Sequence, residues 1–295
     1  MEKVLGDKKA ICIFVLPAFI VFFGIIILPI FLSGYYSLLK WDGIGKSSFV
    51  GLQNYYQLLV QNSDGFLQSV SNSVILAALS VFIQLPLALL FALILASGIK
   101  GEGFFRSVYF IPVVVSTVVI GQLWMKIYHP EYGLLNVFLK SIGFSSWNRE
   151  WLGSTETALM SVFIPLVWQY IGYHMLLMYA SIKSISPEIM EAAKIDGAGP
   201  VKTALRITIP LITPILEVCV TFAVIGSLKT FDLIYILTNG GPVHATEVPS
   251  TLMFNTIFHK YMYGYGSAMA MFIIIECLLL TIVIQKLFRL RSTTY

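Results

Sequence analysis

Six stretches of mainly apolar residues recur along the chain, separated by shorter stretches rich in Gly, Asn, Ser, Tyr and charged residues. The hydrocarbon core of a bilayer is about 30 Å thick, so a helix needs about 20 mostly apolar residues to cross it. Each of these stretches is long enough. The pattern therefore predicts six membrane-spanning helices, at about residues 10–39, 70–96, 105–127, 158–182, 211–237 and 268–288.

The composition agrees with a protein whose main solvent is lipid. Of its 295 residues, 57% are hydrophobic and only 12% are charged, whereas a soluble domain carries about 25% charged residues. The mean hydropathy is +0.83. These values exclude an ordinary cytosolic enzyme and a nucleic-acid-binding module. We predict an all-α integral membrane protein, with residues 1–9 as an N-terminal tail and residues 10–295 as one transmembrane domain.

The distribution of positive charge predicts which side of the membrane each loop faces. Cytoplasmic loops of membrane proteins carry an excess of Lys and Arg. With the N-terminus inside, 12 of the 19 Lys and Arg residues fall on the inside and 7 on the outside, although the outside loops are longer. Both termini are therefore expected in the cytoplasm.

Proline residues within the predicted spans indicate bent helices. Each proline frees a backbone carbonyl that lipid cannot satisfy but a neighbouring helix, a hydroxyl or a wet cavity can. Two interpretations remain open, protein packing around the bends or a pathway for a solute. The prolines are Pro17, Pro29, Pro86, Pro112 and Pro165.

The third inside loop, residues 183–210, carries the signals of two short helices. A Ser-Pro-Glu start at Ser186 supplies a capping hydroxyl, a proline at the first helical position and an acid in the first turn. Gly197 is placed to end this helix in a left-handed conformation. The second helix opens at Pro200 and is expected to stop before Pro210.

The outer surface of this loop is predicted to carry small side chains in its middle and charged side chains at its ends. Small residues let the backbone of a partner approach closely, and charges can orient it. An amphipathic helix resting on lipid headgroups is the alternative. The small residues are Ala192, Ala193, Gly197 and Ala198, and the charged ones are Glu188, Glu191, Lys194 and Asp196.

The same loop resembles the EAA loop of binding-protein-dependent ABC importers. The resemblance lies in Glu191-Ala192-Ala193, Gly197 after three residues, and Ile207-Thr208-Ile209-Pro210 after nine more. It is most similar to carbohydrate permease subunits of the maltose and multiple-sugar type (MalF-like and UgpA-like), for which Ile195-Asp196-Gly197-Ala198 is typical. From about Gly51 to Tyr261 the resemblance also includes Tyr109–Pro112, Ser116, Trp124, Pro130, Tyr132–Asn136, Trp168-Gln169, Gly172, Ser186–Glu188, Phe231–Tyr235, Thr238–Pro242 and Thr246.

The resemblance implies the six-helix fold of type I ABC importer permeases (the MetI-like fold) in the bacterial cytoplasmic (inner) membrane. Residues 183–210, here called the coupling loop, would dock into a cleft of an ATP-hydrolysing subunit. The implied partners are a second homologous permease, two copies of the nucleotide-binding ATPase, an extracytoplasmic solute-binding protein and membrane lipid, with no nucleic acid. The docking residues are predicted to be Glu188, Glu191, Ala192, Ala193, Asp196, Gly197 and Ala198.

The resemblance also implies how such a permease works. ATP-driven closure of the ATPase subunits moves the coupling helices, and rocking of the spans alternates access to a central solute site. ATP and Mg would be bound by the partners, so this chain is expected to be no enzyme and to carry no cofactor or metal. Its solute would be an oligosaccharide or a monosaccharide, with glycerol phosphate or another small polar solute as the alternative within the class.

Polar residues at membrane depth supply candidates for the solute pathway, because they are costly in lipid and face interiors or cavities. A sugar offers hydroxyls on its rim and apolar C–H faces, which suit planar polar groups and aromatic rings. Lys229 and Asp232 are neighbours on one helix face. The alternative to a role in the solute pathway is therefore that their side chains pair with each other. The candidates are Gln84, Gln122, Trp124, Gln169, Tyr173, Lys229, Asp232 and Tyr235.

Few residues of the chain indicate a catalytic, nucleotide-binding or metal-binding site. Three cysteines in apolar stretches, Cys12, Cys219 and Cys277, are interpreted as small core residues rather than a disulfide framework. The stretch from Gly43 to Ser48 resembles the end of a phosphate-binding loop but lacks its first glycine. Intramembrane Glu217 and Glu276 are interpreted as making hydrogen bonds across helices or to a second permease, and His174 is a further ionisable residue within a predicted span.

Two other classes of protein remain as alternatives. A stand-alone ion-coupled secondary transporter would usually show internal repeats with broken helices in matching positions, and the two halves show no self-similarity. An intramembrane enzyme would need a metal set or a nucleophile–base pair at membrane depth, whereas the four histidines are scattered. The permease of an ABC importer is therefore the leading hypothesis.

Overall fold

A computed structural model describes the backbone of residues 8–292 and the side chains of residues 13–289. Within that range the chain is almost entirely helical, and its only strands are β1 (Leu39–Lys40) and β2 (Ser48–Phe49), which pair antiparallel. The predicted all-α class is confirmed. Residues 1–7 of the predicted N-terminal tail and the side chain of Cys12 lie outside the described residues.

The chain divides into two compact units, Met1–Asp64 with Met253–Ile274, and Gly65–Leu252 with Ile275–Tyr295. The first unit contains, besides the strands, α2 (Lys8–Phe22), η1 (Phe23–Ile27), α3 (Leu28–Tyr36), α4 (Gln53–Tyr56) and η2 (Gln57–Gln61). Two helices have residues in both units, α16 (Pro249–Phe258) and α17 (Tyr263–Ser292).

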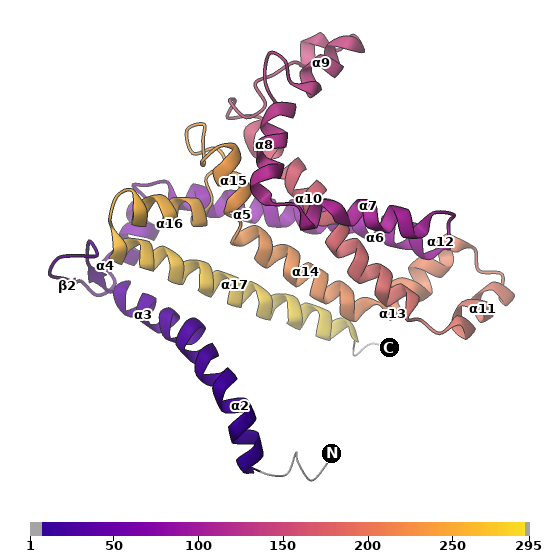
Figure 1. Cartoon of the computed structure of the whole chain (residues 1–295), viewed down its shortest axis with the longest axis horizontal. Helices are drawn as coiled ribbons and strands as arrows, with labels where there is room; N and C mark the ends of the chain where they lie inside the picture. Colours follow the sequence, from indigo (N-terminus) through magenta and orange to yellow (C-terminus); the bar gives the residue numbers. More distant parts are fainter. Residues whose placement is uncertain (1–7, 293–295) are drawn as a thin grey trace. The chain divides into compact units, whose positions relative to one another are not determined.

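The second unit contains the remaining helices of the described chain (Figure 1). They are α5 (Phe66–Leu79), η3 (Ser80–Gln84), α6 (Leu85–Ala96), α7 (Glu102–Val114), α8 (Thr117–Ile127), α9 (Leu134–Ser141), η4 (Ser145–Trp147), α10 (Ala158–Lys183), α11 (Pro187–Ile195), α12 (Pro200–Thr203), η5 (Ala204–Thr208), α13 (Ile209–Leu211), α14 (Thr213–Leu228) and α15 (Asp232–Leu237).

The stretch that resembles a phosphate-binding loop lies in the hairpin of the first unit. This stretch forms the turn between β1 and β2, with no buried strand before it and no long helix opening from it. Asp42 Oδ1 accepts hydrogen bonds from the backbone N–H groups of Ile44 (3.1 Å) and Gly45 (2.9 Å). These bonds favour the ionised carboxylate and lower the pKa of Asp42. The residues therefore serve a local turn.

Within the described part of the chain, five helices are long and apolar enough to cross a membrane, namely Ile13–Tyr36, Phe66–Ala96, Ala158–Lys183, Thr213–Leu237 and Tyr263–Arg289. The predicted span 105–127 is not a straight helix: α7 and α8 meet there at 98°. Apart from Ser116, every residue from Val113 to Ile120 is β-branched, and such residues lower helix propensity. Counted as one broken span, this pair raises the total to six.

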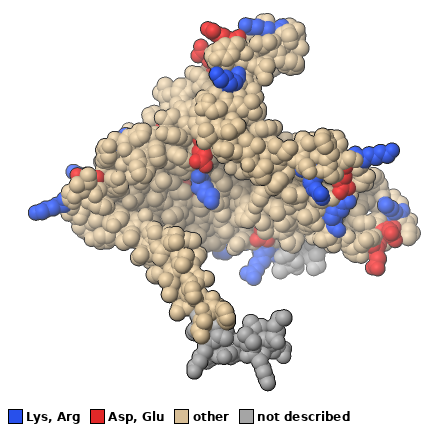
Figure 2. Space-filling model, in the orientation of Figure 1, with Lys and Arg blue, Asp and Glu red and all other residues tan. Residues whose placement is uncertain are grey.

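Charged side chains are sparse on the face drawn in Figure 2, where most of them lie over α9 and towards α11 and α12. Long apolar surface with few charges is what a lipid environment requires. In the stretch Ile13–Tyr36 none of the best apolar window is buried within the chain. The distribution of charge thus agrees with a membrane protein.

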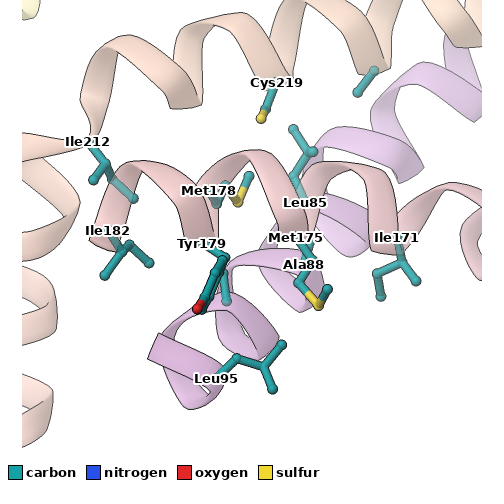
Figure 3. Packing of buried hydrophobic residues seen from close by; sticks show 12 residues of the cluster. Leu85, Ala88, Leu95, Ile171, Met175, Met178, Tyr179, Ile182, Ile212 and Cys219 are labelled. Carbon is teal, nitrogen blue, oxygen red and sulfur yellow. The ribbon is translucent and has the colours of Figure 1, made fainter. Parts of the chain in front are cut away.

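The core of the second unit lies where α6, α10 and α14 pack together (Figure 3). Met175 and Met178 of α10 are fully buried, as are Ala88 of α6 and Cys219 of α14. Helices in lipid associate through close packing rather than through exclusion of water, so small residues at their contacts are expected. Cys219 is a buried core residue, as predicted, and Cys277 is half-buried.

Three of the helix interruptions follow one rule that involves proline. Each consists of a five-residue π-helical turn and then a residue followed by proline, at Pro29, Pro86 and Pro210. In each case the N–H group just before the proline donates to the carbonyl five residues earlier. The wider turn relieves the clash that proline makes with the carbonyl four residues back. Pro17, Pro112 and Pro165 instead lie inside α-helices.

Candidate functional site

A cavity of about 520 Å³ lies within the second unit. Its size falls in the usual range for small-molecule sites, about 300–1,000 Å³. Its walls combine aromatic rings with amide, hydroxyl, imidazole, ammonium and carboxylate groups. The lining residues with polar or aromatic side chains are Ser80, Gln84, Thr117, Gln169, Tyr170, Tyr173, His174, Phe222, Ser227, Lys229, Thr230, Phe231 and Asp232.

Three interruptions of regular helix meet at this cavity. The π-helical turn η3 contributes Ser80 and Gln84, and Thr117 comes from the start of α8, just after its break from α7. The third interruption is the segment 229–231 between α14 and α15. Irregular backbone at membrane depth is tolerated where it is buried in protein or lines a cavity. The three interruptions therefore lie where irregular backbone is tolerated, at the wall of a cavity.

One face of α10 forms a wall of the cavity, with its side chains three and four residues apart. Gln169 donates from Nε2 to Thr117 Oγ1 (3.3 Å), and its other polar atom, Oε1, is buried without a partner among the described residues. Nδ1 of His174 is also buried, and no described residue forms a hydrogen bond with it. A buried polar group without a partner costs about 1–3 kcal/mol. Both groups would be satisfied by the hydroxyls of a bound solute.

The facing wall brings hydroxyls and two opposite charges. Ser80 and Ser227 share a hydrogen bond (3.1 Å), which joins η3 to α14. Lys229 and Asp232 both line the cavity, and among the ion pairs of the described residues they are not joined. In this structure the two side chains therefore do not form an ion pair with each other.

The structure gathers five of the eight predicted pathway residues around the cavity, namely Gln84, Gln169, Tyr173, Lys229 and Asp232. The other three do not line it. Gln122 is exposed, Trp124 contacts the rings of Tyr128 (5.2 Å) and Trp168 (6.0 Å), and Tyr235 stacks on Phe231 (5.1 Å).

Sequence reasoning left several lining residues out of the predicted site. Thr117 and Thr230 lie beside helix breaks that hydropathy does not reveal. Ser80 precedes the predicted residue Gln84 by four positions, a spacing that places both on one face of a helix. Tyr170 and His174 extend the α10 face that already held Gln169 and Tyr173, and this spacing was readable from the sequence.

Glu276 illustrates a polar group at membrane depth whose role stays a prediction. Its Oε2 is buried and makes no hydrogen bond to the described residues. The expected bond across helices is therefore absent at that atom. A bond to a second permease remains the interpretation for Glu276.

The coupling loop begins as predicted. Ser186 Oγ accepts a hydrogen bond from the backbone N–H of Glu188 (3.3 Å), and Pro187 is the first residue of α11. Gly197 is left-handed, with φ at +70°. The N–H of Ala198 bonds to the carbonyl of Ala193 (2.9 Å), and the N–H of Gly197 bonds to that of Lys194 (3.1 Å). This pair of bonds is a Schellman cap, so the glycine end of the first helix is confirmed.

The second helix of the coupling loop corrects the prediction that it would stop before Pro210. Helical conformation continues from α12 through η5 into α13, which ends at Leu211. Ile209 N–H bonds to the carbonyl of Ala204 in the π-helical turn. Because this wider turn accommodates the proline, the helix passes Pro210 and ends one residue beyond it.

The exposed surface of the coupling loop differs from the predicted one at Ala193. That residue is only 4% exposed, so it faces inward rather than outward. Glu188, Glu191, Ala192, Asp196 and Gly197 are exposed, and Ala198 is half-buried.

Two apolar side chains that were not predicted stand out from the loop. Ile195 is 85% exposed, and Val201 is 72% exposed. A large apolar side chain held in the open marks a contact with a partner or a membrane when it belongs to a patch. Their position after the Glu-Ala-Ala run was readable from the sequence, but their exposure was not.

The Thr-Asn-Gly-Gly-Pro stretch forms a compact loop after α15. Asn72 of α5 donates to the backbone carbonyls of Ala245 (3.1 Å) and Glu247 (2.8 Å). Glu247 is buried and accepts from Thr251 Oγ1 (2.8 Å). A Cβ atom at Gly240 would lie 2.7 Å from the Glu247 carboxylate, and Gly240 has φ at +84°. Glycine therefore fits this position for two reasons: a side chain would collide with the carboxylate, and the backbone is in the left-handed conformation.

Within the described residues, no group of three or more His, Cys, Asp or Glu side chains could hold a metal ion. The polar groups of the cavity instead suit hydrogen bonding to a neutral or weakly charged solute.

Comparison with known proteins agrees with this architecture. Residues 84–293 match the family model described as binding-protein-dependent transport system inner membrane component. The chain is 38% identical to the probable ABC transporter permease protein YurN of Bacillus subtilis, over 94% of this chain and 95% of that one. It is 36% identical to the trehalose/maltose transport system permease protein MalF of Thermococcus litoralis, over 97% and 95% of the two chains.

A solved structure has the same fold. A chain in the crystal structure of a bacterial alginate ABC transporter, in complex with an alginate pentasaccharide-bound periplasmic protein, superposes with a TM-score of 0.81 at 22% identity. The match covers 92% of this chain and 91% of that chain. The chain described here therefore belongs to the family of inner-membrane components of binding-protein-dependent transport systems.

Proposed function

We propose that this chain is one of two paired permease subunits of an ABC importer that moves a sugar into the cell. The observation that carries the proposal is the cavity of the second unit, where Gln169 Oε1 and His174 Nδ1 are buried and unpaired beside Tyr170 and Tyr173. Aromatic faces with a few convergent polar groups suit a sugar. The related MalF is named for trehalose and maltose, which supports a carbohydrate.

The charge of the cavity favours an uncharged sugar over glycerol phosphate. Lys229 is its only Lys or Arg side chain among the described lining residues, and Asp232 lines the same cavity. Phosphate recognition usually calls for forked or clustered cationic donors. A carboxylate in the cavity opposes an anionic solute. Glycerol phosphate therefore remains the weaker alternative.

The coupling loop is proposed to dock on a nucleotide-binding ATPase subunit. The exposed residues Glu188, Glu191 and Asp196 would orient the partner, and Ile195 would enter an apolar recess. ATP and Mg would be bound there rather than on this chain. The remaining proposed partners are a second permease and an extracytoplasmic binding protein, with the two units of this chain acting as one permease domain.

The proposed topology places both termini and the coupling loop on the cytoplasmic side, following the excess of Lys and Arg in those segments. A cysteine introduced at exposed Ile195 should then react with a maleimide only from the cytoplasmic side. Labelling from outside in intact cells would contradict the topology.

The function is tested by ATP hydrolysis of the reconstituted complex, which contains this chain, its paired permease, the ATPase and the binding protein. The panel of solutes comprises maltose, trehalose, xylose, diacetylchitobiose and glycerol phosphate. Stimulation by a neutral sugar that requires the binding protein is the expected result. Stimulation by glycerol phosphate alone would favour the alternative, and no stimulation by any sugar would contradict the carbohydrate assignment.

A further inference from the structure

The end of α10 that leads into the coupling loop is clamped to the start of α7 by a group of four side chains. The Tyr179 hydroxyl of α10 donates a hydrogen bond to Glu102 Oε1, at the first residue of α7. Lys183 Nζ donates to Glu102 Oε2 (3.4 Å). The Arg106 guanidinium lies 5.7 Å from the centre of the Tyr179 ring, and Lys183 Nζ lies 5.6 Å from it. Glu102 is thus the shared acceptor of the group.

The clamp lies close to the coupling loop along the chain, and the connection between them is ordered. Lys183 is the last residue of α10, and α11 begins at Pro187. The connection is hydrogen-bonded: the N–H of Ile185 bonds to the carbonyl of Ile182 (3.2 Å), and Ser184 Oγ bonds to that of Ser181 (2.8 Å). A displacement of α11 would therefore be passed directly to the end of α10.

Two further contacts join α10 to the α7–α8 pair beyond the clamp. A Cβ atom at Gly172 of α10 would lie 1.9 Å from the carbonyl oxygen of Tyr109, so the backbones of α7 and α10 touch there. The hydrogen bond between Gln169 and Thr117 joins α10 to α8 at the cavity. The far end of α7 also reaches the cavity, through Val113. α7 therefore extends from the clamp to the solute site.

We propose that Glu102 and Tyr179 are positioning residues that couple the coupling loop to the cavity through α7. This inference rests on the proposed function, because it assumes that an ATPase displaces the loop. Tyr179 is only 7% exposed, whereas the side chains of Glu102 and Lys183 are 24% and 43% exposed. Ion pairs this accessible to solvent contribute little to stability. The clamp holds the start of α7 to α10, so that both helices move when the loop moves.

The test measures this transmission without requiring the identity of the solute. Val113→Cys, in a chain whose native cysteines are replaced by Ala, places a thiol in the cavity at the far end of α7. The complex is reconstituted with its ATPase partner, and the labelling rate of Cys by a maleimide is compared with and without ATP plus vanadate. With Glu102 and Tyr179 intact, the rate should change by about fivefold or more, the lower end of usual allosteric coupling.

Tyr179→Phe removes only the hydroxyl, and Glu102→Gln removes only the charge. Each should reduce the change in labelling on trapping to less than about twofold while ATP hydrolysis continues. The double variant should be no more impaired than Tyr179→Phe, because both changes act on one contact. Full additivity of the two changes would contradict a shared clamp.

Matched controls exist elsewhere in the second unit. Tyr128→Phe removes a buried hydroxyl that has no partner, and Glu156→Gln removes the charge of an exposed ion pair with Arg149 (3.9 Å). Both should retain the full change in labelling.

The outcomes separate the inference from the proposed function. If labelling of the Val113→Cys chain with an intact clamp does not respond to trapping, the proposed coupling to an ATPase fails. If it responds and Tyr179→Phe responds equally, the clamp has no positioning role. Failure of Tyr179→Phe to assemble, judged by size-exclusion chromatography, would make the clamp purely structural and would overturn the inference.

Discussion

The coupling loop and the cavity lie in the same unit, yet they are assembled from different kinds of contact. The loop is shaped by local hydrogen bonds, such as those that the N–H groups of Glu188 and Ala198 donate to Ser186 Oγ and to the carbonyl of Ala193. The cavity is shaped by bonds between residues distant in sequence: Gln169 and Thr117 are 52 positions apart, and Ser80 and Ser227 are 147 apart. A local structure survives changes elsewhere, whereas a structure of distant parts depends on how closely its helices pack.

This difference implies that the two regions fail in different ways. A disturbed helix contact behind the cavity should disrupt the folded unit, since the walls have no support of their own. A disturbed coupling loop should leave the unit folded and interrupt only its communication with a partner.

Gly172→Ala should have the largest effect. The new Cβ would lie 1.9 Å from the carbonyl oxygen of Tyr109 and would force α7 and α10 apart. Overpacking typically costs about 1–3 kcal/mol and more where backbone blocks the atom. The yield of monodisperse complex in size-exclusion chromatography and its Tm should both fall.

Gly103→Ala is the matched control for that prediction. Its Cβ would have no atom within 4 Å, and the residue lies in α7 itself. Because Ala is a better helix former, stability should be unchanged or rise by up to about 1 kcal/mol. Equal losses from both substitutions would show that the Gly172 contact is not special.

Gly197→Trp should leave the complex assembled but reduce sugar uptake by roughly tenfold or more, a fall within the usual range of allosteric coupling. A Cβ at Gly197 would meet no atom within 4 Å, so the side chain would project from the loop and block close docking. Uptake by proteoliposomes, with ATP hydrolysis measured in parallel, checks this result.

The conformation of Gly197 requires its own control, because φ is +70°. Asn tolerates the left-handed region better than other side chains, so Gly197→Asn keeps the turn with a small polar group. It should retain most of the uptake. Normal uptake by Gly197→Trp would be incompatible with docking at this loop.

Gln169→Leu should raise the KM for the transported sugar about tenfold, the effect of losing one hydrogen bond to the solute. The stability of the complex should fall by only about 1 kcal/mol, because the substitution removes one hydrogen bond, from Nε2 to Thr117 Oγ1 (3.3 Å), and Oε1 has no partner among the described residues. Gln122→Leu is the control, since Gln122 was a sequence candidate but does not line the cavity. A larger change in KM at Gln122 would refute the cavity as the solute site.

The smallest expected effect is a difference in labelling with no loss of function. Ala192 is exposed, whereas Ala193 is 4% exposed. In a chain whose native cysteines are replaced, Ala193→Cys should react with a maleimide about tenfold more slowly than Ala192→Cys, because thiol reactivity depends on access. Equal rates would mean that the loop is not packed as described.

The class of the protein, the positions of its apolar helices and the first helix of the coupling loop could be predicted from the amino-acid sequence. These features depend on composition, on runs of about 20 apolar residues and on capping residues a few positions apart. Such signals are local. The Ser186 start and the Gly197 end were readable for that reason, as was the α10 face that holds Gln169 and Tyr173.

The places where the chain departs from those patterns became visible only in the folded structure. Hydropathy is the same in a straight helix and in one bent by 98°, so the break between α7 and α8 was not visible in it. Pro210 is passed rather than avoided because a π-helical turn absorbs it. Ala193 is turned inward, and Gln122, Trp124 and Tyr235 lie outside the cavity, because packing between distant helices selects which side chains face each other.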